Sequence, residues 1–304
     1  MSQQIKNVML IGASGLLGSH VFEALQSEAS FHLSVLARKS SKATFPSHIK
    51  VYRIDDDSPL AQLVDAFKGQ DALVSTLPGR PYEVHMRMID AAVQAGVKRF
   101  IPSEYGNNTC NAASELVPLY GDKAKVLAHL KSQESTGLTW TAIQNGQFFD
   151  WGLDTGWLSY DLKSKKALIF DSGKTKWSTT TIGTVAAAVV KVLLKPEETK
   201  NRPVHIASFT VSQQQVLDAL EKASGASWTT DTIASDAAMK MGQEIDRNGD
   251  SEGLRLSVLL LMYADDADRG GNFEETFSLD NEMLGLPVEH LSLVVERIVK
   301  QQQA

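Results

Sequence analysis

Three evenly spaced glycines are the residues of this 304-residue sequence that most clearly suggest chemistry. They lie directly after the apolar run 8–11, in the segment Gly12-Ala13-Ser14-Gly15-Leu16-Leu17-Gly18. Between a strand and a helix, the first glycine permits a tight turn, the second lets a pyrophosphate approach the backbone, and the third lets the helix pack on the strand. Free N–H groups at the start of the helix attract phosphate. The segment therefore predicts a dinucleotide site, with an ordinary glycine-rich turn as the alternative.

The residues after the next expected strand indicate which dinucleotide binds. An NAD site usually places Asp or Glu there to bind the ribose hydroxyls, but this sequence reads Ala37-Arg38-Lys39-Ser40. The planar, charged guanidinium of Arg38 suits a 2′-phosphate, and we expect Lys39 to add to the attraction. The predicted cofactor is NADP(H), and a solvated basic turn is the alternative.

The usual proton-transfer pair of short-chain dehydrogenases, a tyrosine followed four residues later by a lysine, is absent. The tyrosines stand at positions 52, 82, 105, 120, 160 and 263, and none has a lysine at that spacing. The sequence therefore does not support the classical short-chain dehydrogenase mechanism.

A longer segment resembles a known signature. Residues Lys98-Arg99-Phe100-Ile101-Pro102-Ser103-Glu104-Tyr105-Gly106-Asn107 are similar to a motif of the isoflavone reductase-like proteins. That group includes the pinoresinol–lariciresinol and phenylcoumaran benzylic ether reductases and lies within the NmrA-like, atypical short-chain dehydrogenases/reductases. The glycine loop and the segments 71–76, 120–126 and 137–141 match in the same order, so the resemblance covers residues 5–150. It implies a reductase that uses NADP(H).

In that family an aromatic residue, two further residues and then a lysine mark the catalytic lysine, which the resemblance places at Lys123. Helical spacing supports the assignment, because Val126, Leu127 and Leu130 follow at three, four and seven residues and share its face. Lys125 belongs to another face and should be solvated. An inward lysine can act as general acid or base, with its pKa lowered by burial and by the positive ring of the oxidised cofactor. A lysine whose stem merely packs at the helix start is the alternative.

Aromatic residues follow the strand expected at 138–143, at the edge where open parallel sheets bind ligands. We expect Phe148 to lie against the cofactor, and Phe149, Trp151 and the more distant Tyr263 to line a pocket for a small aromatic or conjugated substrate. Packing into the core is the alternative. Thr76, which ends one of the matching segments, completes the predicted cofactor site.

Other polar residues are ambiguous. Glu104 either takes part in function or holds the loop 103–107 through backbone N–H groups. No metal site is predicted, because His85, His129 and His205 are not spaced with a second ligand. The chain carries Leu127 where the plant enzymes have an arginine, so substrate contacts of the plant type are not implied.

Strand and helix patterns alternate through the first half of the chain. Strands are expected at 8–11, 33–36, 49–53, 72–75, 99–102 and 138–143, with helices at 16–26, 60–67, 84–95 and 122–134. This order predicts an α/β fold, a doubly wound parallel sheet of Rossmann type. The pattern then loosens, with helices at 182–194 and 212–223, a strand at 204–207 and a loop at 245–251. We therefore expect an NADP-binding Rossmann domain over 1–150 and a smaller α+β substrate region over 151–304.

Composition excludes several classes of protein. The net charge of −6 argues against a nucleic-acid partner. Cys110, a loop residue, is the only cysteine, so no internal disulfide is possible and a cytoplasmic location is expected. No apolar run approaches the ~20 residues of a membrane helix, and no signal peptide is evident. A small-molecule substrate and a monomer or homodimer fit best.

These features predict an NADPH-dependent reductase that transfers hydride to a small conjugated or aromatic substrate, with Lys123 as the general acid or base. The alternative is an NmrA-like regulator that binds NADP(H) as a redox sensor without turnover. The fold alone does not separate the two, but Lys123 favours the enzyme because a sensor does not need it.

Overall fold

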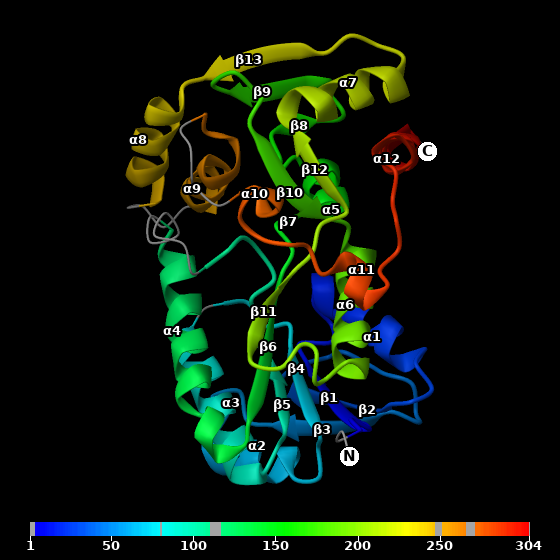
Figure 1. Ribbon diagram of the computed structural model, residues 1–304, viewed down its shortest axis with the longest axis vertical. Coiled ribbons are helices and arrows are strands. Elements are labelled where there is room, and N and C mark those ends of the chain that lie inside the picture. Colours follow the sequence, from blue (N-terminus) through cyan, green and yellow to red (C-terminus); the bar gives the residue numbers. More distant parts are fainter. Residues whose placement is uncertain (1–3, 80, 110–116, 247–250, 266–270, 304) are drawn as a thin grey trace.

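The computed structural model describes residues 4–79, 81–109, 117–246, 251–265 and 271–303. Cys110 and part of the loop expected at 245–251 lie outside these residues. Figure 1 shows one large sheet with its helices in the lower half of the molecule, and two small sheets with further helices in the upper half. In the described part of the chain, no helix combines the length and the apolar character needed to span a bilayer.

The large sheet has seven parallel strands in the order β11-β6-β5-β4-β1-β2-β3. This confirms the expected α/β architecture of Rossmann type. The strands are β1 (Asn7–Ile11), β2 (His32–Arg38), β3 (Lys50–Ile54), β4 (Ala72–Ser75), β5 (Arg99–Ile101), β6 (Thr139–Gln144) and β11 (Arg202–His205).

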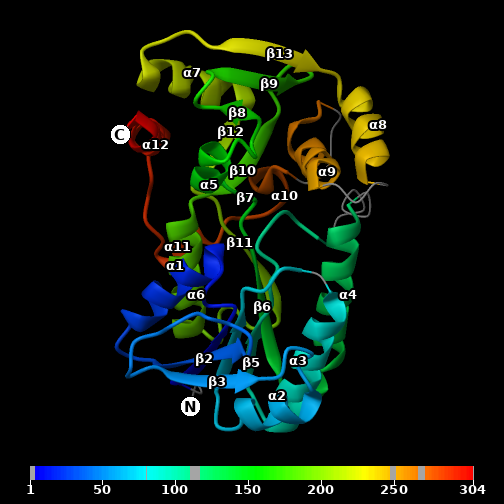
Figure 2. The same ribbon diagram turned by 180° about the vertical axis from the view of Figure 1, so that it is seen from behind.

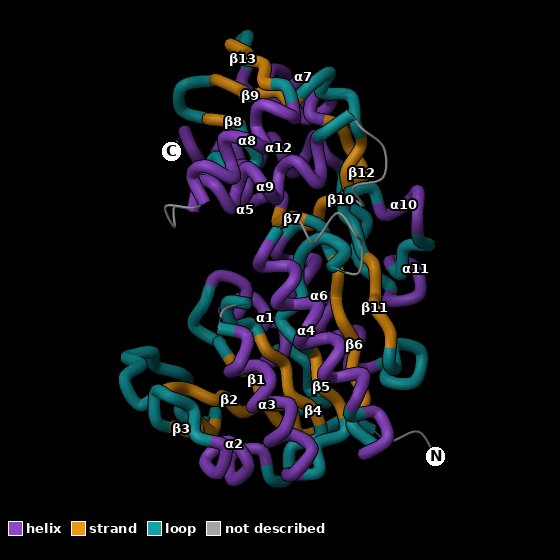
Figure 3. The backbone as a smooth tube through the Cα atoms, turned by 90° about the vertical axis from the view of Figure 1, so that its left-hand side faces the viewer, coloured by secondary structure: helices purple, strands orange, loops and turns teal. Residues whose placement is uncertain are grey.

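Helices cover both faces of this sheet, as Figures 2 and 3 show from two other sides. Helices α1 (Leu16–Gln26) and α6 (Ile182–Leu194) pack on one face, and α2 (Leu60–Phe67), α3 (Tyr82–Ala95) and α4 (Pro118–Ser132) on the other. Successive strand residues point to opposite faces, so Val8 and Leu10 join the first core while Met9 and Ile11 join the second. Covering both faces explains the continuous apolar runs seen in these strands.

The seventh strand differs from expectation. β11 comes from well beyond residue 150, and it pairs in parallel with β6 from Arg202–Thr141 to His205–Gln144. Helix α6, also beyond residue 150, contributes to the core beneath α1. The physical reason is that β6 would otherwise be an exposed edge with unpaired backbone groups. The division expected at residue 150 therefore does not describe the sheet, which takes a helix and a strand from the second half.

A buried arginine attaches this returning segment. The side chain of Arg99, at the start of β5, is 3% exposed and donates hydrogen bonds to the hydroxyls of Thr139, Thr141 and Thr199, and to the Pro196 carbonyl. Burial lowers the pKa of Arg99 to about 10, so the guanidinium remains charged at neutral pH. One side chain thus joins β5, β6 and the segment before β11.

The remaining elements form the second half of the molecule around a core of their own. Two three-stranded sheets have the orders β12-β10-β7 and β13-β9-β8. Their strands are β7 (Gln147–Phe148), β8 (Tyr160–Asp161), β9 (Lys166–Phe170), β10 (Lys176–Thr180), β12 (Phe209–Ser212) and β13 (Thr229–Ile233). The helices are α5 (Phe149–Asp154), α7 (Gln213–Ser224), α8 (Ser235–Asp246), α9 (Ser251–Tyr263), α10 (Phe273–Thr276), α11 (Asn281–Leu284) and α12 (Leu291–Gln303).

Candidate active site

The glycine loop makes a compact turn between β1 and α1. Gly12 has φ +91°, a conformation that favours glycine, and the Gly15 N–H donates to the Gly12 carbonyl at 3.0 Å. A Cβ at Gly18 would lie 2.0 Å from the Gly12 oxygen, so the helix packs against the loop as closely as a glycine allows. Thr76 braces this turn, since its N–H and its hydroxyl both donate to the Ile11 carbonyl, at 2.8 and 3.0 Å.

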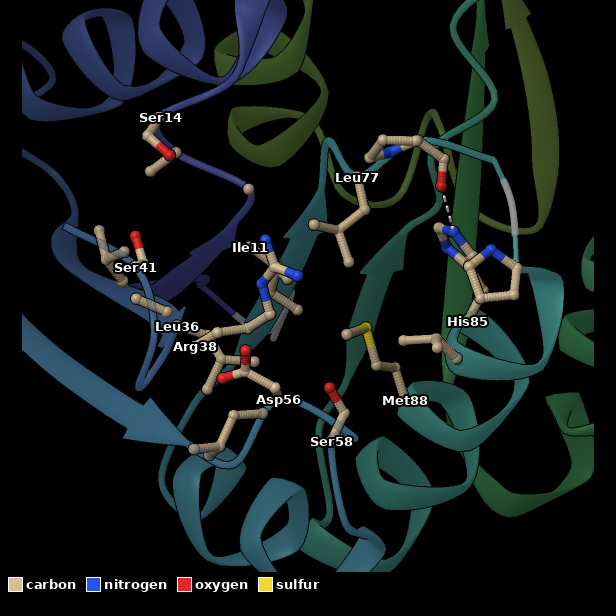
Figure 4. A pocket seen from close by; sticks show the side chains of 18 of the residues that line it. Ile11, Ser14, Leu36, Arg38, Ser41, Asp56, Ser58, Leu77, His85 and Met88 are labelled. Atoms are coloured by element: carbon tan, nitrogen blue, oxygen red, sulfur yellow. Dashed lines mark hydrogen bonds between the residues drawn. The ribbon is translucent and has the colours of Figure 1, made fainter. Parts of the chain in front are cut away.

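A cavity of about 450 Å³ opens beside the loop, between β2, the end of β3 and α3. Figure 4 shows its lining, which includes Arg38 and Asp56 on one side and His85 and Met88 on the other. Of the glycine-loop residues, three line this cavity: Gly12, Ala13 and Ser14. Gly15, Leu16, Leu17 and Gly18 do not; Leu17 is buried and Leu16 is 45% exposed.

The two cations after β2 have different surroundings. Arg38 lines the cavity, and within the described residues no group accepts a hydrogen bond from its guanidinium. Lys39 instead forms an exposed ion pair with Asp55, 2.6 Å from Nζ to the carboxylate. Hydrogen bonding by Ser40, with Arg38 nearby, lowers the pKa of Asp56. Arg38 is therefore the cation that a ligand in the cavity would meet.

These features fit a dinucleotide that carries an additional phosphate. The backbone of Gly12, Ala13 and Ser14 borders the cavity just before the start of helix α1, where phosphate is attracted. Arg38 supplies a positive charge on the adjacent wall.

Lys123 lies inside the protein on α4, as the helical spacing predicted. It is 8% exposed, whereas the side chain of Lys125 is 57% exposed and pairs with Asp122 at 3.0 Å. The Lys123 ammonium donates to the backbone carbonyl of Glu104 and lies 5.8 Å from the centre of the Tyr120 ring. Burial lowers the pKa of Lys123, and the nearby Glu104 carboxylate opposes this change.

Lys123 does not itself line the cavity, but the loop after β4 contacts both the lysine and the cavity. A Cβ at Gly79 would lie 3.4 Å from Lys123 Cε, and the preceding Pro78 lines the cavity. His85 lines it too, is 3% exposed, and hydrogen-bonds through Nε2 to the Pro78 carbonyl at 2.8 Å. Burial lowers the pKa of His85, the Pro78 bond opposes this, and Lys123 adds to the lowering.

From the sequence, His85 was considered only as a metal ligand and was not placed at the cofactor site. The signal that could have found it is its position in the first turn of the helix that follows β4, at the edge where parallel sheets bind ligands. Glu104, left open by the sequence, is 1% exposed and accepts a hydrogen bond from the Thr109 hydroxyl at 2.6 Å. Its carbonyl holds Lys123, so it contributes to the position of the lysine.

The predicted aromatic residues do not come together. Phe148 is half-buried against the sheet core, whereas Phe149 is fully buried with its ring edge-on to Phe209. Tyr263 is 1% exposed and its hydroxyl donates to the Leu158 carbonyl at 3.2 Å. Phe149 and Tyr263 are thus core residues. Their burial does not support the predicted contact with a substrate, which stays a prediction.

Trp151 lies elsewhere. Its ring is 5.4 Å from that of Trp157, and it lines a second cavity, of about 610 Å³, together with residues of α1, α6 and α12. This cavity is not the one beside the glycine loop, and the contact of Trp151 with a substrate stays a prediction. No group of three or more potential metal ligands occurs among the described residues.

Comparison with known proteins shows the family. A sequence model of the NmrA-like family matches residues 4–252, and the chain belongs to that family. This confirms the resemblance found in the segment 98–107. Individual relatives and solved structures resemble the chain over almost its whole length.

The oxidoreductase AprR of Aspergillus flavus is 38% identical over 297 residues, which cover 96% of this chain and 98% of that protein. Among solved structures, an isoflavone reductase has a TM-score of 0.75 at 19% identity, covering 98% of this chain and 100% of the other. A leucoanthocyanidin reductase–NADPH complex from Vitis vinifera has a TM-score of 0.75 at 18% identity, covering 96% and 99%. The fold is shared with these structures, and the names agree with the expected reductase class and NADP(H).

Proposed function

We propose that this chain is an NADPH-dependent reductase that acts on a small conjugated or aromatic substrate, with Lys123 handling the proton. The observation that carries the proposal is the buried Lys123 ammonium, held by a backbone carbonyl next to the dinucleotide-type cavity. The relative named as an oxidoreductase and the neighbour solved with NADPH support it.

The cofactor would be held by the lining of the 450 Å³ cavity. Gly12, Ala13 and Ser14 would receive the pyrophosphate, and Arg38 would pair with the 2′-phosphate. Thr76 would keep the turn in shape. When bound, NADPH supplies a hydride to the substrate.

Lys123 would supply the matching proton. Reduction of a conjugated double bond adds a hydride to one carbon and a proton to the oxygen or the neighbouring carbon, and the Lys123 ammonium releases that proton from Nζ. Burial lowers the pKa of Lys123 and so makes the release easier near neutral pH. The Glu104 carbonyl fixes the direction of the ammonium group.

The test is a screen of NADPH oxidation with enones, quinones and benzylic ethers, followed by two alanine variants on the same helix. Lys123→Ala should reduce turnover by roughly 10²–10⁴-fold with little change in NADPH affinity. Lys125→Ala is the matched control and should have almost no effect, because its ammonium is exposed and paired with Asp122. Equal behaviour of the two variants would refute the role of Lys123.

The same screen addresses the alternative function. A protein that binds NADPH tightly but oxidises it with no compound in the screen would favour a regulator that senses NADP(H) over a reductase.

A further inference from the structure

Buried polar atoms without a hydrogen-bond partner are concentrated in one region. Among the described residues there are seven such side-chain atoms, and six of them lie at the carboxyl edge of β4, β5 and β6. They belong to Ser75, Tyr105, Asn107, Gln144 and Asn145. Native proteins satisfy nearly all of their buried polar groups. A group of exceptions at the ligand-binding edge of a parallel sheet points to a polar ligand there.

Asn107 stands out in this group. Neither its amide nitrogen nor its amide oxygen has a partner, although the residue is only 2% exposed. An amide that is buried with none of its hydrogen bonds formed destabilises the folded protein. Because this amide does not help the protein to fold, a role in ligand binding explains its presence better than a role in stability.

Asn107 is also fixed beside the lysine. Its backbone N–H donates to the Tyr120 hydroxyl, and Tyr120 precedes Lys123 by about one turn of α4. A Cβ at the neighbouring Gly106 would lie 3.6 Å from Lys123 Nζ and 3.7 Å from the Tyr120 hydroxyl. The backbone of Gly106 and Asn107 therefore lies beside both the Lys123 ammonium and the Tyr120 hydroxyl.

We propose that the Asn107 amide binds the carbonyl oxygen of the substrate next to Lys123, so that the substrate is a small oxygenated carbonyl compound. This deepens the proposed reductase function and rests on it. Hydride addition to the β-carbon of a conjugated carbonyl moves an electron pair onto oxygen, giving an enolate. The side-chain amide N–H of Asn107 stabilises that charge, and a proton from Lys123 converts the enolate into the saturated ketone. The unpartnered oxygens of Gln144 and Asn145 suit hydroxyl groups on the same ligand.

The first measurement is thermal stability. Asn107→Leu replaces an unsatisfied amide by an apolar group of similar size, so we expect a melting temperature equal to or above that of the wild type. Asn281→Leu is the matched control, because the Asn281 amide is satisfied on both sides by Ala207, at 3.1 and 2.8 Å. That variant should melt at a lower temperature. If Asn107→Leu is destabilised like the control, Asn107 is a structural residue.

The second measurement does not need turnover. Benzylacetone, a ketone that cannot be reduced as an enone, and butylbenzene, which lacks the oxygen, are titrated into protein saturated with NADP⁺, with tryptophan fluorescence as the signal. Asn107→Leu should weaken benzylacetone binding about tenfold, the loss of one hydrogen bond, and leave butylbenzene unchanged.

Each other result overturns the proposal. Equal benzylacetone affinity in wild type and variant, or no binding by the wild type, removes the carbonyl site. Weaker NADP⁺ binding by Asn107→Leu assigns the amide to the cofactor instead. Absence of NADPH oxidation by the wild type in the substrate screen refutes the proposed reductase function. That result comes from a different measurement than the binding titrations, so the two failures can be distinguished.

Discussion

Arg38 is the residue on which the choice between NADPH and NADH should depend, because it is the cation of the β2 end that lines the cavity. We expect tighter binding of NADPH than of NADH, and Arg38→Ala should remove most of the difference, about 1.5–3 kcal/mol for a charge-assisted contact. Lys39→Ala should change either affinity little, because Lys39 does not line the cavity and its ammonium already pairs with Asp55 at the surface. Titration of both cofactors into the three proteins measures this. Equal wild-type affinities would refute the assignment.

Helix α1 must approach the glycine loop closely for its N–H groups to face the cavity, and Gly18 sets that distance. A Cβ there would lie 2.0 Å from the Gly12 oxygen and 2.8 Å from the Thr76 hydroxyl. Gly18→Ala should therefore displace the helix, lower the melting temperature and weaken NADPH binding at least about tenfold. Gly121→Ala is the control on α4, where a Cβ would meet no atom within 4 Å, and it should stabilise the protein by up to about 1 kcal/mol. Unchanged NADPH binding by Gly18→Ala would contradict this account of the loop.

At the scale of the whole molecule, the central sheet is complete only with β11 and α6 from the second half of the chain. A fragment of residues 1–150 would leave the β6 edge unpaired and the face beneath α1 open to water, and Arg99 would lose its bonds to Thr199 and Pro196. We expect this fragment to lack a cooperative thermal transition and to bind no NADPH, while the full chain unfolds cooperatively. Circular dichroism and cofactor titration on both would check this. A folded fragment that binds NADPH would show that the first half is an independent domain.

The spacing of residues along the chain was sufficient to predict those features that depend on neighbouring residues. Helices α1, α2 and α6 have the expected bounds, because their apolar periodicity and flanking residues lie within the segments themselves. The same spacing separated the buried Lys123 from the exposed Lys125, since a shift of two positions on a helix points a side chain to another face. The glycine loop was recognisable for a similar reason: its three glycines act through their own backbone.

Contacts between distant segments were decided by the tertiary structure alone. β11 joins β6 across more than fifty residues because an exposed strand edge needs a partner, and the pattern of either strand does not name it. Phe149 and Tyr263 pack into the core of the second half of the molecule, because apolar neighbours from other elements surround them there. Lys39 pairs with Asp55, which follows a different strand. The unpartnered amide of Asn107 and the unpartnered amide oxygens of Gln144 and Asn145 became visible only once β5 and β6 lay side by side. The sequence by itself determined the class of fold, the glycine turn and the inward lysine, because these depend on short-range geometry. The surroundings of the lysine depend on which strand ends meet at one edge of the sheet, and only folding brings those together.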